Sequence, residues 1–226
     1  MNSVIFEDFI KTLEENIHKN YMYIADAFEN EYGWLEVDPV RSEVCECIIC
    51  GFHQAAITLI NHLLESALKK ALIIDESVKN ETEQSNIIDV SNDATDKYAN
   101  KDLNFTINQA CQKGLIAKDE KKLLHKFRKQ YRNAFSHADP QKTFGDITLP
   151  AKIVTTKDCD NPDDFFTKIF TEKPNISIPV ANNVMLQGIV QSINAEQQAV
   201  YYFLAVDRII RNLCQRLFNR DRKSVV

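Results

Sequence analysis

The chain of 226 residues is poor in the residues that make turns, with only five glycines and six prolines. So few turn formers over this length favour long helices over many short strands. The chain also lacks an apolar run near the ~20 residues of a membrane span. Its first residues, MNSVIFEDFIK, lack the basic start and apolar core of a signal peptide. We therefore expect a cytoplasmic protein that makes no contact with a membrane.

The six cysteines do not have the spacing of a disulfide framework, so we expect reduced thiols. One group resembles a metal site at first sight, because Cys45, Cys47, Cys50 and His53 lie close together in the sequence. These residues lead straight into an expected helix, however, and there they cannot converge on one tetrahedral ion. We expect neither a metal nor a cofactor.

An excess of positive charge is absent too, since the formal net charge is −5. The protein as a whole is therefore not expected to attract nucleic acid. The charge is unevenly spread, however. Acidic residues concentrate at the N-terminus and in 75–102, and basic residues in 113–132 and 208–223. An acidic total can therefore coexist with a basic surface.

Apolar residues recur at steps of three and four, which predicts amphipathic helices. The predicted helices span residues 2–32, 42–72, 102–113, 119 to the stretch 130–140, and 182–218. The second has the widest apolar stripe and belongs in the middle of a bundle. Residues 75–100 are polar and acidic, which predicts a surface loop with at most a short helix. Weak alternation within 141–181 predicts either a two-stranded patch or extended segments.

These segments predict an all-α fold, an up-and-down bundle of four to five main helices in a single domain over residues 1–226. Its core comprises about 43–140 and 182–220. The N-terminal helix covers 2–32, and an irregular insertion, 141–181, precedes the last helix.

The stretch QYRNAFSHADP, residues 130–140, ends the fourth predicted helix. Asn133 and His137 are four residues apart and share a helix face. Pro140 disfavours helical geometry at the residue before it and loosens the last turn, so the imidazole can move toward Arg132. A histidine suits proton transfer near neutral pH, and a guanidinium suits a phosphate. No carboxylate cluster with metal-ligand spacing accompanies them, which favours metal-independent RNA cleavage.

The pattern Arg-Asn-x-x-x-His near the end of a helix, in an all-helical domain, resembles the HEPN superfamily. The signature of that superfamily is an arginine, four to six residues and a histidine, often with a polar residue directly after the arginine. Arg132, Asn133 and His137 match these elements. The stretches HQAAITLINHLLESALKKAL and NQACQKGLI before the motif are also similar. The resemblance covers roughly 43–140, with the final helix as the last bundle member, and residues 141–181 take no part in it.

The resemblance implies a metal-independent endoribonuclease that acts as a toxin or an antiviral defence effector through attack of the 2′-hydroxyl. Arg132 would stabilise the phosphorane, His137 would carry the proton, and Asn133 would orient one of them or the phosphate. The implied partners are an RNA substrate, a second copy that forms a composite cleft, and an antitoxin or another defence-system protein. Several HEPN branches have lost activity, so the alternative is a non-catalytic module that binds RNA or a partner protein.

Other residues near the motif have less distinctive roles. Basic residues that precede it would form a phosphate track: Lys121, Lys122, Lys126, Arg128 and Lys129. His62 and Glu65 either support the motif or are exposed, and exposure is favoured. His125 is expected on a solvated face. The spacing of three tyrosines predicts that they belong to the core: Tyr131, Tyr201 and Tyr202.

Overall fold

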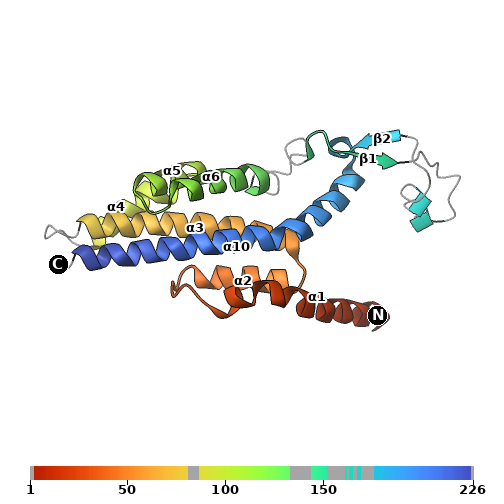
Figure 1. The fold of residues 1–226 in the computed structure, drawn as a ribbon, viewed down its shortest axis with the longest axis horizontal. Coiled ribbons are helices and arrows are strands. Elements are labelled where there is room, and N and C mark those ends of the chain that lie inside the picture. Colours follow the sequence, from red (N-terminus) through yellow and green to blue (C-terminus); the bar gives the residue numbers. More distant parts are fainter. Residues whose placement is uncertain are drawn as a thin grey trace.

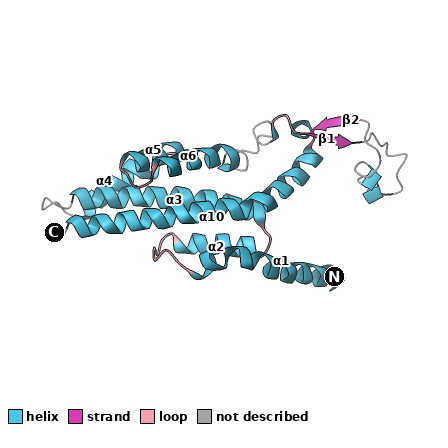
Figure 2. Ribbon diagram, in the orientation of Figure 1, coloured by secondary structure: helices cyan, strands magenta, loops and turns pink. Residues whose placement is uncertain are grey.

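The computed structural model describes residues 3–80, 87–132, 144–151, 161, 163–164, 167–168 and 176–224. It is mostly helical, which confirms the all-α class (Figure 2). The α-helices are α1 (Ser3–Glu29), α2 (Asp38–Ile49), α3 (His53–Asn80), α4 (Ile87–Ala99), α5 (Leu103–Gln112), α6 (Lys118–Phe127) and α10 (Val184–Ser224). Two short strands, β1 (Thr148–Ala151) and β2 (Ile176–Pro179), pair antiparallel.

Helices α3 and α10 lie side by side in the middle of the molecule (Figure 1). Helices α1 and α2 cover one side of this pair, and α5 and α6 cover the other. The first part of α1 and the first part of α10 extend beyond the packed bundle, and α10 leads back to the two strands (Figure 1). The part of α1 that extends has exposed apolar side chains, namely Val4, Ile5, Phe6 and Phe9.

The core lies along α3, as the apolar stripe predicted. Helix α3 contributes Ile57, Ile60, Leu63, Leu64, Ala67, Leu68, Ala71 and Leu72, all at most 1% exposed. Helix α10 faces them with Tyr202, Phe203, Val206, Ile209, Ile210 and Leu213. Burial of a large apolar side chain contributes about 1.5–3 kcal/mol, so this seam is the main source of stability. Residues 128–132, which lead to the motif, also contact α3.

The predicted helix over 42–72 is two helices. Residues 50–52 interrupt it, and Gly51 adopts φ +83°, in the left-handed region that favours glycine. A Cβ at Gly51 would meet the Asn16 side chain at 2.6 Å, so α1 approaches the chain closely at this turn. The Asn16 amide donates to the Cys50 carbonyl across the same contact. The break lets α2 fold back along α3, and the two helices are in contact.

The prediction of a surface loop over 75–100 is wrong. Helix α3 continues to Asn80, and α4 follows from Ile87. Helix α4 packs on α3, with Ala94 and Tyr98 buried. Ala94 and Tyr98 are four apart, so they share the face of α4 that meets the bundle.

The region before α10 contains the two-stranded patch that was one of its two predicted forms. Thr148 pairs with Pro179, and Ala151 with Ile176. A small apolar cluster separate from the main core supports the pair, formed by Phe144, Val180, Ala181 and Leu186. Residues 163–164 and 167–168, also within this insertion, are helical.

Charged side chains join the helices at the C-terminal end of α10. The Asp75 carboxylate, with 2% of its side chain exposed, accepts from Arg220 Nη1 at 2.5 Å and from Lys113 Nζ at 3.0 Å. Lys113 and Lys97 also donate to Glu76. These contacts tie α3, α4 and α10 to the end of α5. Within the described ranges, no helix is both long and apolar enough to cross a membrane.

Candidate functional site

Helix α6, which leads to the motif, is anchored at its start by Glu120. The Glu120 carboxylate accepts from the Ala117 backbone N–H at 2.7 Å, which satisfies one free donor of the helix end. It also accepts from Arg216 Nη1 at 2.6 Å and Asn212 Nδ2 at 2.8 Å, both on α10. Burial opposes ionisation of Glu120, but these hydrogen bonds outweigh it and lower its pKa. The start of α6 is therefore fixed to α10.

The end of α6 is held by stacked aromatic rings. Tyr131 stacks on Tyr202 of α10 with 4.4 Å between ring centroids, and Phe127 lies 4.8 Å from Tyr202. Tyr131 is 3% exposed, and its hydroxyl donates to Gln198 Oε1 at 3.0 Å. Burial raises the pKa of Tyr131 to about 12, so it stays protonated near neutral pH. The prediction that Tyr131 belongs to the core is confirmed, and so is that for Tyr202.

Between α6 and the motif, the backbone forms a π-helix, η1 (Arg128–Arg132). The sequence predicted a loosened turn later, near His137, and gave no signal for this one. π-turns carry one extra residue per turn and occur frequently at functional sites. Here Tyr131 points into the core while Arg132, the next residue, is half-buried at the surface.

Arg132 lies against α3 and pairs with Glu65. Its Nη2 atom is 3.6 Å from Glu65 Oε2, and the two side chains are 29% and 26% exposed. Glu65 also pairs with Lys69, one turn further along α3, at 3.0 Å. The favoured expectation that Glu65 is merely exposed is therefore wrong, because it holds the candidate catalytic arginine. His62, one turn before Glu65, is exposed as expected.

The other two motif residues, Asn133 and His137, lie outside the described residues. The described part of the site is therefore Arg132 with Glu65 and Lys69. The signal for Glu65 was its position, since residue 65 is three after His62 and four before Lys69 on one helix face. That spacing alone does not reveal which neighbouring helix the face meets.

The predicted phosphate track is the surface of α6 and η1 opposite the core. Lys122, Lys126 and Lys129 are exposed, and Lys121 and Arg128 are half-buried. The Arg128 Nε atom is buried and has no hydrogen-bond partner among the described residues. Whether this surface binds RNA stays a prediction.

The pKa of His125 responds to the positive charge of this surface. It is half-buried rather than solvated as expected, with Nε2 3.3 Å from Asn108 Oδ1. Burial lowers its pKa, and the positive charges of Arg128, Lys121 and Lys129 lower it further. The basic side chains therefore lie close enough together to act on one imidazole.

The cysteine segment is divided between two helices and the turn that joins them. Cys45 and Cys47 lie on α2, Cys50 follows its last residue, and His53 begins α3. In the part of the chain that the structure describes, no group of three His, Cys, Asp or Glu residues is arranged to hold an ion. The described cysteines, Cys45, Cys47, Cys50, Cys111 and Cys214, are free thiols.

We compared the chain with protein-family models, curated proteins and solved structures, and none of them matches it. The resemblance to the HEPN superfamily therefore rests on the motif and its helical setting alone.

Proposed function

We propose that the protein is a metal-independent endoribonuclease of the HEPN type that acts as a toxin or in antiviral defence. Arg132 binds the scissile phosphate, His137 carries the proton, and Asn133 orients one of them or the phosphate. The all-α fold and the position of Arg132 at the end of a basic helix support this proposal.

The observation that carries the proposal is the contact between Arg132 and Glu65. A guanidinium that only stabilised the bundle would be expected to make short contacts to a buried carboxylate. Arg132 instead makes a contact of 3.6 Å to a carboxylate that is 26% exposed. A long pair between partly exposed side chains contributes about 0–1 kcal/mol, so the guanidinium can turn toward an RNA phosphate that binds beside Glu65 at little cost. Glu65 then acts as a positioning residue that keeps the guanidinium beside α3.

The chemistry needs an acid–base group and an anion clamp. His137 accepts the proton of the 2′-hydroxyl, and the 2′-oxygen attacks the adjacent phosphorus. The bond from phosphorus to the 5′-oxygen breaks, and the 5′-oxygen takes up a proton and leaves as a hydroxyl. The guanidinium of Arg132 stabilises the negative charge of the crowded phosphorane between these steps. The products carry a 2′,3′-cyclic phosphate and a 5′-hydroxyl.

The test is incubation of the purified protein with single-stranded RNA in EDTA, followed by analysis of the ends produced. We expect cyclic phosphate and 5′-hydroxyl ends, the same rate with and without EDTA, and no cleavage by His137→Ala. Cleavage that survives both Arg132→Ala and His137→Ala would show that this motif is not the nuclease site.

We also propose a homodimer in which the motifs of both chains face one cleft. The exposed apolar residues at the start of α1 support a further protein contact, because patches of this kind mark interaction sites. Light scattering at tens of micromolar tests this, with a dimer as the expected result. A monomer, or a dimer with the motifs on opposite outer faces, contradicts it.

The same exposed residues favour the second candidate, a non-catalytic module that binds a partner protein. Val4, Ile5, Phe6 and Phe9 lie on α1, away from Arg132 in the sequence and on another helix. A protein that cuts no RNA under any condition, but binds a partner through these residues, would support the module.

A further inference from the structure

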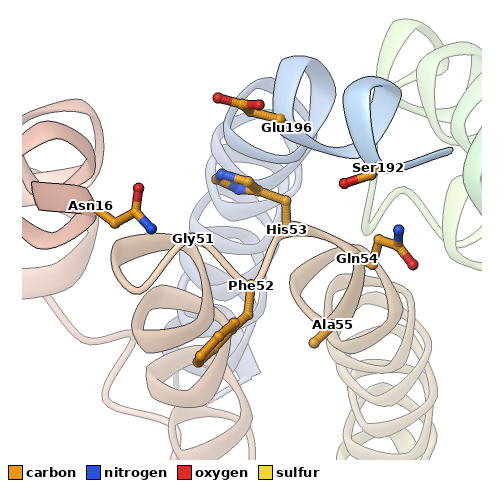
Figure 3. Close-up of a pocket in the computed structure, with 8 residues that line it drawn as sticks. All are labelled: Asn16, Gly51, Phe52, His53, Gln54, Ala55, Ser192 and Glu196. Carbon is orange, nitrogen blue, oxygen red and sulfur yellow. The ribbon is translucent and has the colours of Figure 1, made fainter. Parts of the chain in front are cut away.

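Two adjoining cavities lie where α1, α3 and α10 meet. They share His53 and Glu196, and their volumes are about 470 Å³ and 680 Å³. Volumes of this size are in the range of small-molecule and nucleotide pockets. The smaller one is polar, and Figure 3 shows Asn16, His53, Ser192 and Glu196 around it. The larger one is mostly apolar.

The walls of the apolar cavity include two exposed aromatic rings. Tyr23 of α1 is 59% exposed and Tyr201 of α10 is 52% exposed. Apolar side chains of α10 complete the wall, namely Ile193, Val200 and Leu204. The sequence predicted that Tyr201 belongs to the core, and this is wrong. Exposed rings in a cavity can stack on nucleobases, each of which presents a flat face.

Tyr201 connects this cavity to the motif helix. Its ring packs edge-on against Phe127, with 5.9 Å between the centroids. Phe127 is the last residue of α6 and also contacts Tyr131, next to Arg132. Phe127 and Tyr131 are buried, so these ring contacts join the wall of the cavity, through the core, to the residue that precedes Arg132.

The cavity also offers hydrogen-bonding groups for the edge of a base. Burial lowers the pKa of His53, with Lys19 adding to the effect and Glu196 opposing it, which favours the neutral imidazole. The His53 Nδ1 atom is buried and has no partner among the described residues. Lys19 and Glu196 pair at 3.3 Å, with side chains about 60% exposed, so water screens them and they can exchange partners.

We propose that the apolar cavity between α1 and α10 holds a nucleobase of the single-stranded RNA substrate, stacked on Tyr201 and Tyr23. The same RNA strand would contact Arg132 through a phosphate and Tyr201 through a base. Lys19 is the cationic side chain of the cavity wall and faces the backbone of the RNA, while His53 and Glu196 read the edge of the base. This inference rests on the proposed ribonuclease function.

The experiment measures binding of a fluorescent single-stranded oligoribonucleotide by anisotropy, with the His137→Ala protein so that no cleavage intervenes and Arg132 can still bind phosphate. In this background, Tyr201→Ala and Tyr23→Ala should each weaken binding about tenfold, because each removes one stacking platform. Tyr201→Phe should keep the affinity, since the ring remains. Met22→Ala is the matched control, because Met22 is 77% exposed on α1 and is not part of either cavity wall.

Unchanged affinity in both tyrosine-to-alanine variants would overturn the proposal, and so would an equal loss in Met22→Ala. A second arm uses adenosine monophosphate. If it binds and depends on Tyr201 while RNA binding does not, the cavity takes a free nucleotide and the proposal is wrong. Tyrosine-dependent RNA binding without any cleavage by the unmodified protein would support the base site and contradict the nuclease. Cleavage that depends on Arg132 but not on either tyrosine would do the reverse.

Discussion

The two basic stretches of the sequence look alike but are used differently in the structure. In the C-terminal stretch, Arg211, Arg216 and Arg220 each pair with a carboxylate, at 2.7, 2.6 and 2.5 Å. In the stretch before the motif, Lys122, Lys126 and Lys129 are exposed and form no ion pair with another described residue.

Arg132 and Arg220 show the contrast most directly, because both pair with carboxylates of α3. Asp75, the partner of Arg220, has 2% of its side chain exposed and a second cation in Lys113. Glu65, the partner of Arg132, is 26% exposed and the contact is longer. The distance of the contact and the burial of the partner carboxylate, rather than residue type, separate the arginine that joins helices from the one that we propose binds a phosphate.

The largest effect is expected from the motif itself. Arg132→Ala and His137→Ala should each lower the rate of RNA cleavage by at least about 10²–10³, the usual loss for one positioned charge-stabilising group. Arg132→Lys should not restore the rate, because an ammonium lacks the planar fork of the guanidinium. Asn133→Ala should lose less. The exposed Arg208, in the C-terminal stretch, offers the control, and Arg208→Ala should cleave like the unmodified protein.

The free energy of unfolding should depend more on Arg220 than on Arg132. Arg220→Ala leaves the buried Asp75 with one cation fewer and should lower the free energy of unfolding by about 2 kcal/mol. Arg132→Ala should lower it by less than about 1 kcal/mol, since its pair is partly exposed. Urea unfolding followed by circular dichroism measures both. Equal losses in the two variants would remove the distinction between a structural and a functional arginine.

Acid should weaken the Asp75 end of the bundle. Hydrogen bonds from Lys113 and then Lys97 lower the pKa of Glu76 from 4.5 to about 2. A lowered pKa means that the stabilisation is complete above the unfolded value and is lost as the pH falls from about 4.5 toward 2. Glu76→Gln should flatten this part of the dependence of the melting temperature on pH. A variant that keeps the same slope would show that other carboxylates cause it.

Loss of the Glu65 carboxylate should lower both kcat and KM. Glu65→Gln frees Arg132 to bind phosphate but no longer holds the guanidinium beside α3. We expect KM to fall and kcat to fall about tenfold, on the order of one lost oriented contact. Glu65→Asp should recover part of kcat, because a carboxylate remains. An unchanged kcat in Glu65→Gln would mean that Glu65 does not position Arg132.

The smallest effect is expected from single lysines of α6. Lys126→Ala should weaken RNA binding a few-fold and reduce the slope of log affinity against log salt by about 0.7, one phosphate contact on a single strand. Cleavage at saturating RNA should be unchanged. A loss that does not depend on salt would indicate that Lys126 supports the fold instead of contacting RNA.

Much of the fold could be predicted because burial leaves a periodic pattern in the sequence. Ile60, Leu64, Leu68 and Leu72 of α3 are spaced by four and are all buried. The break at Gly51 was missed, because apolar spacing continues on both sides of it and only the glycine signals the turn. Helix α4 was missed since two buried residues, Ala94 and Tyr98, lie among polar neighbours.

The candidate site was less accessible to prediction because it depends on which faces of different helices meet. Arg132 was chosen from the motif, but its partner Glu65 is 67 positions earlier on another helix. Tyr201 has the spacing of a core residue, yet its ring is 52% exposed between Phe127 and a cavity. Spacing along one helix shows on which face a side chain lies. It does not show how far neighbouring helices bury that side chain.

The π-helix at 128–132 makes the site depend on chain length as well as on residue identity. An α-helix turns by about 100° per residue, so one residue more or less rotates everything after it by that angle. Deletion of the exposed Gln130 would remove the surplus residue and let the backbone close into an ordinary α-turn. Either the aromatic ring of Tyr131 would leave its place on Tyr202, or Arg132 would leave Glu65. The direction in which Arg132 points therefore depends on the number of residues before it. A substitution keeps this number, whereas the deletion of one codon changes it.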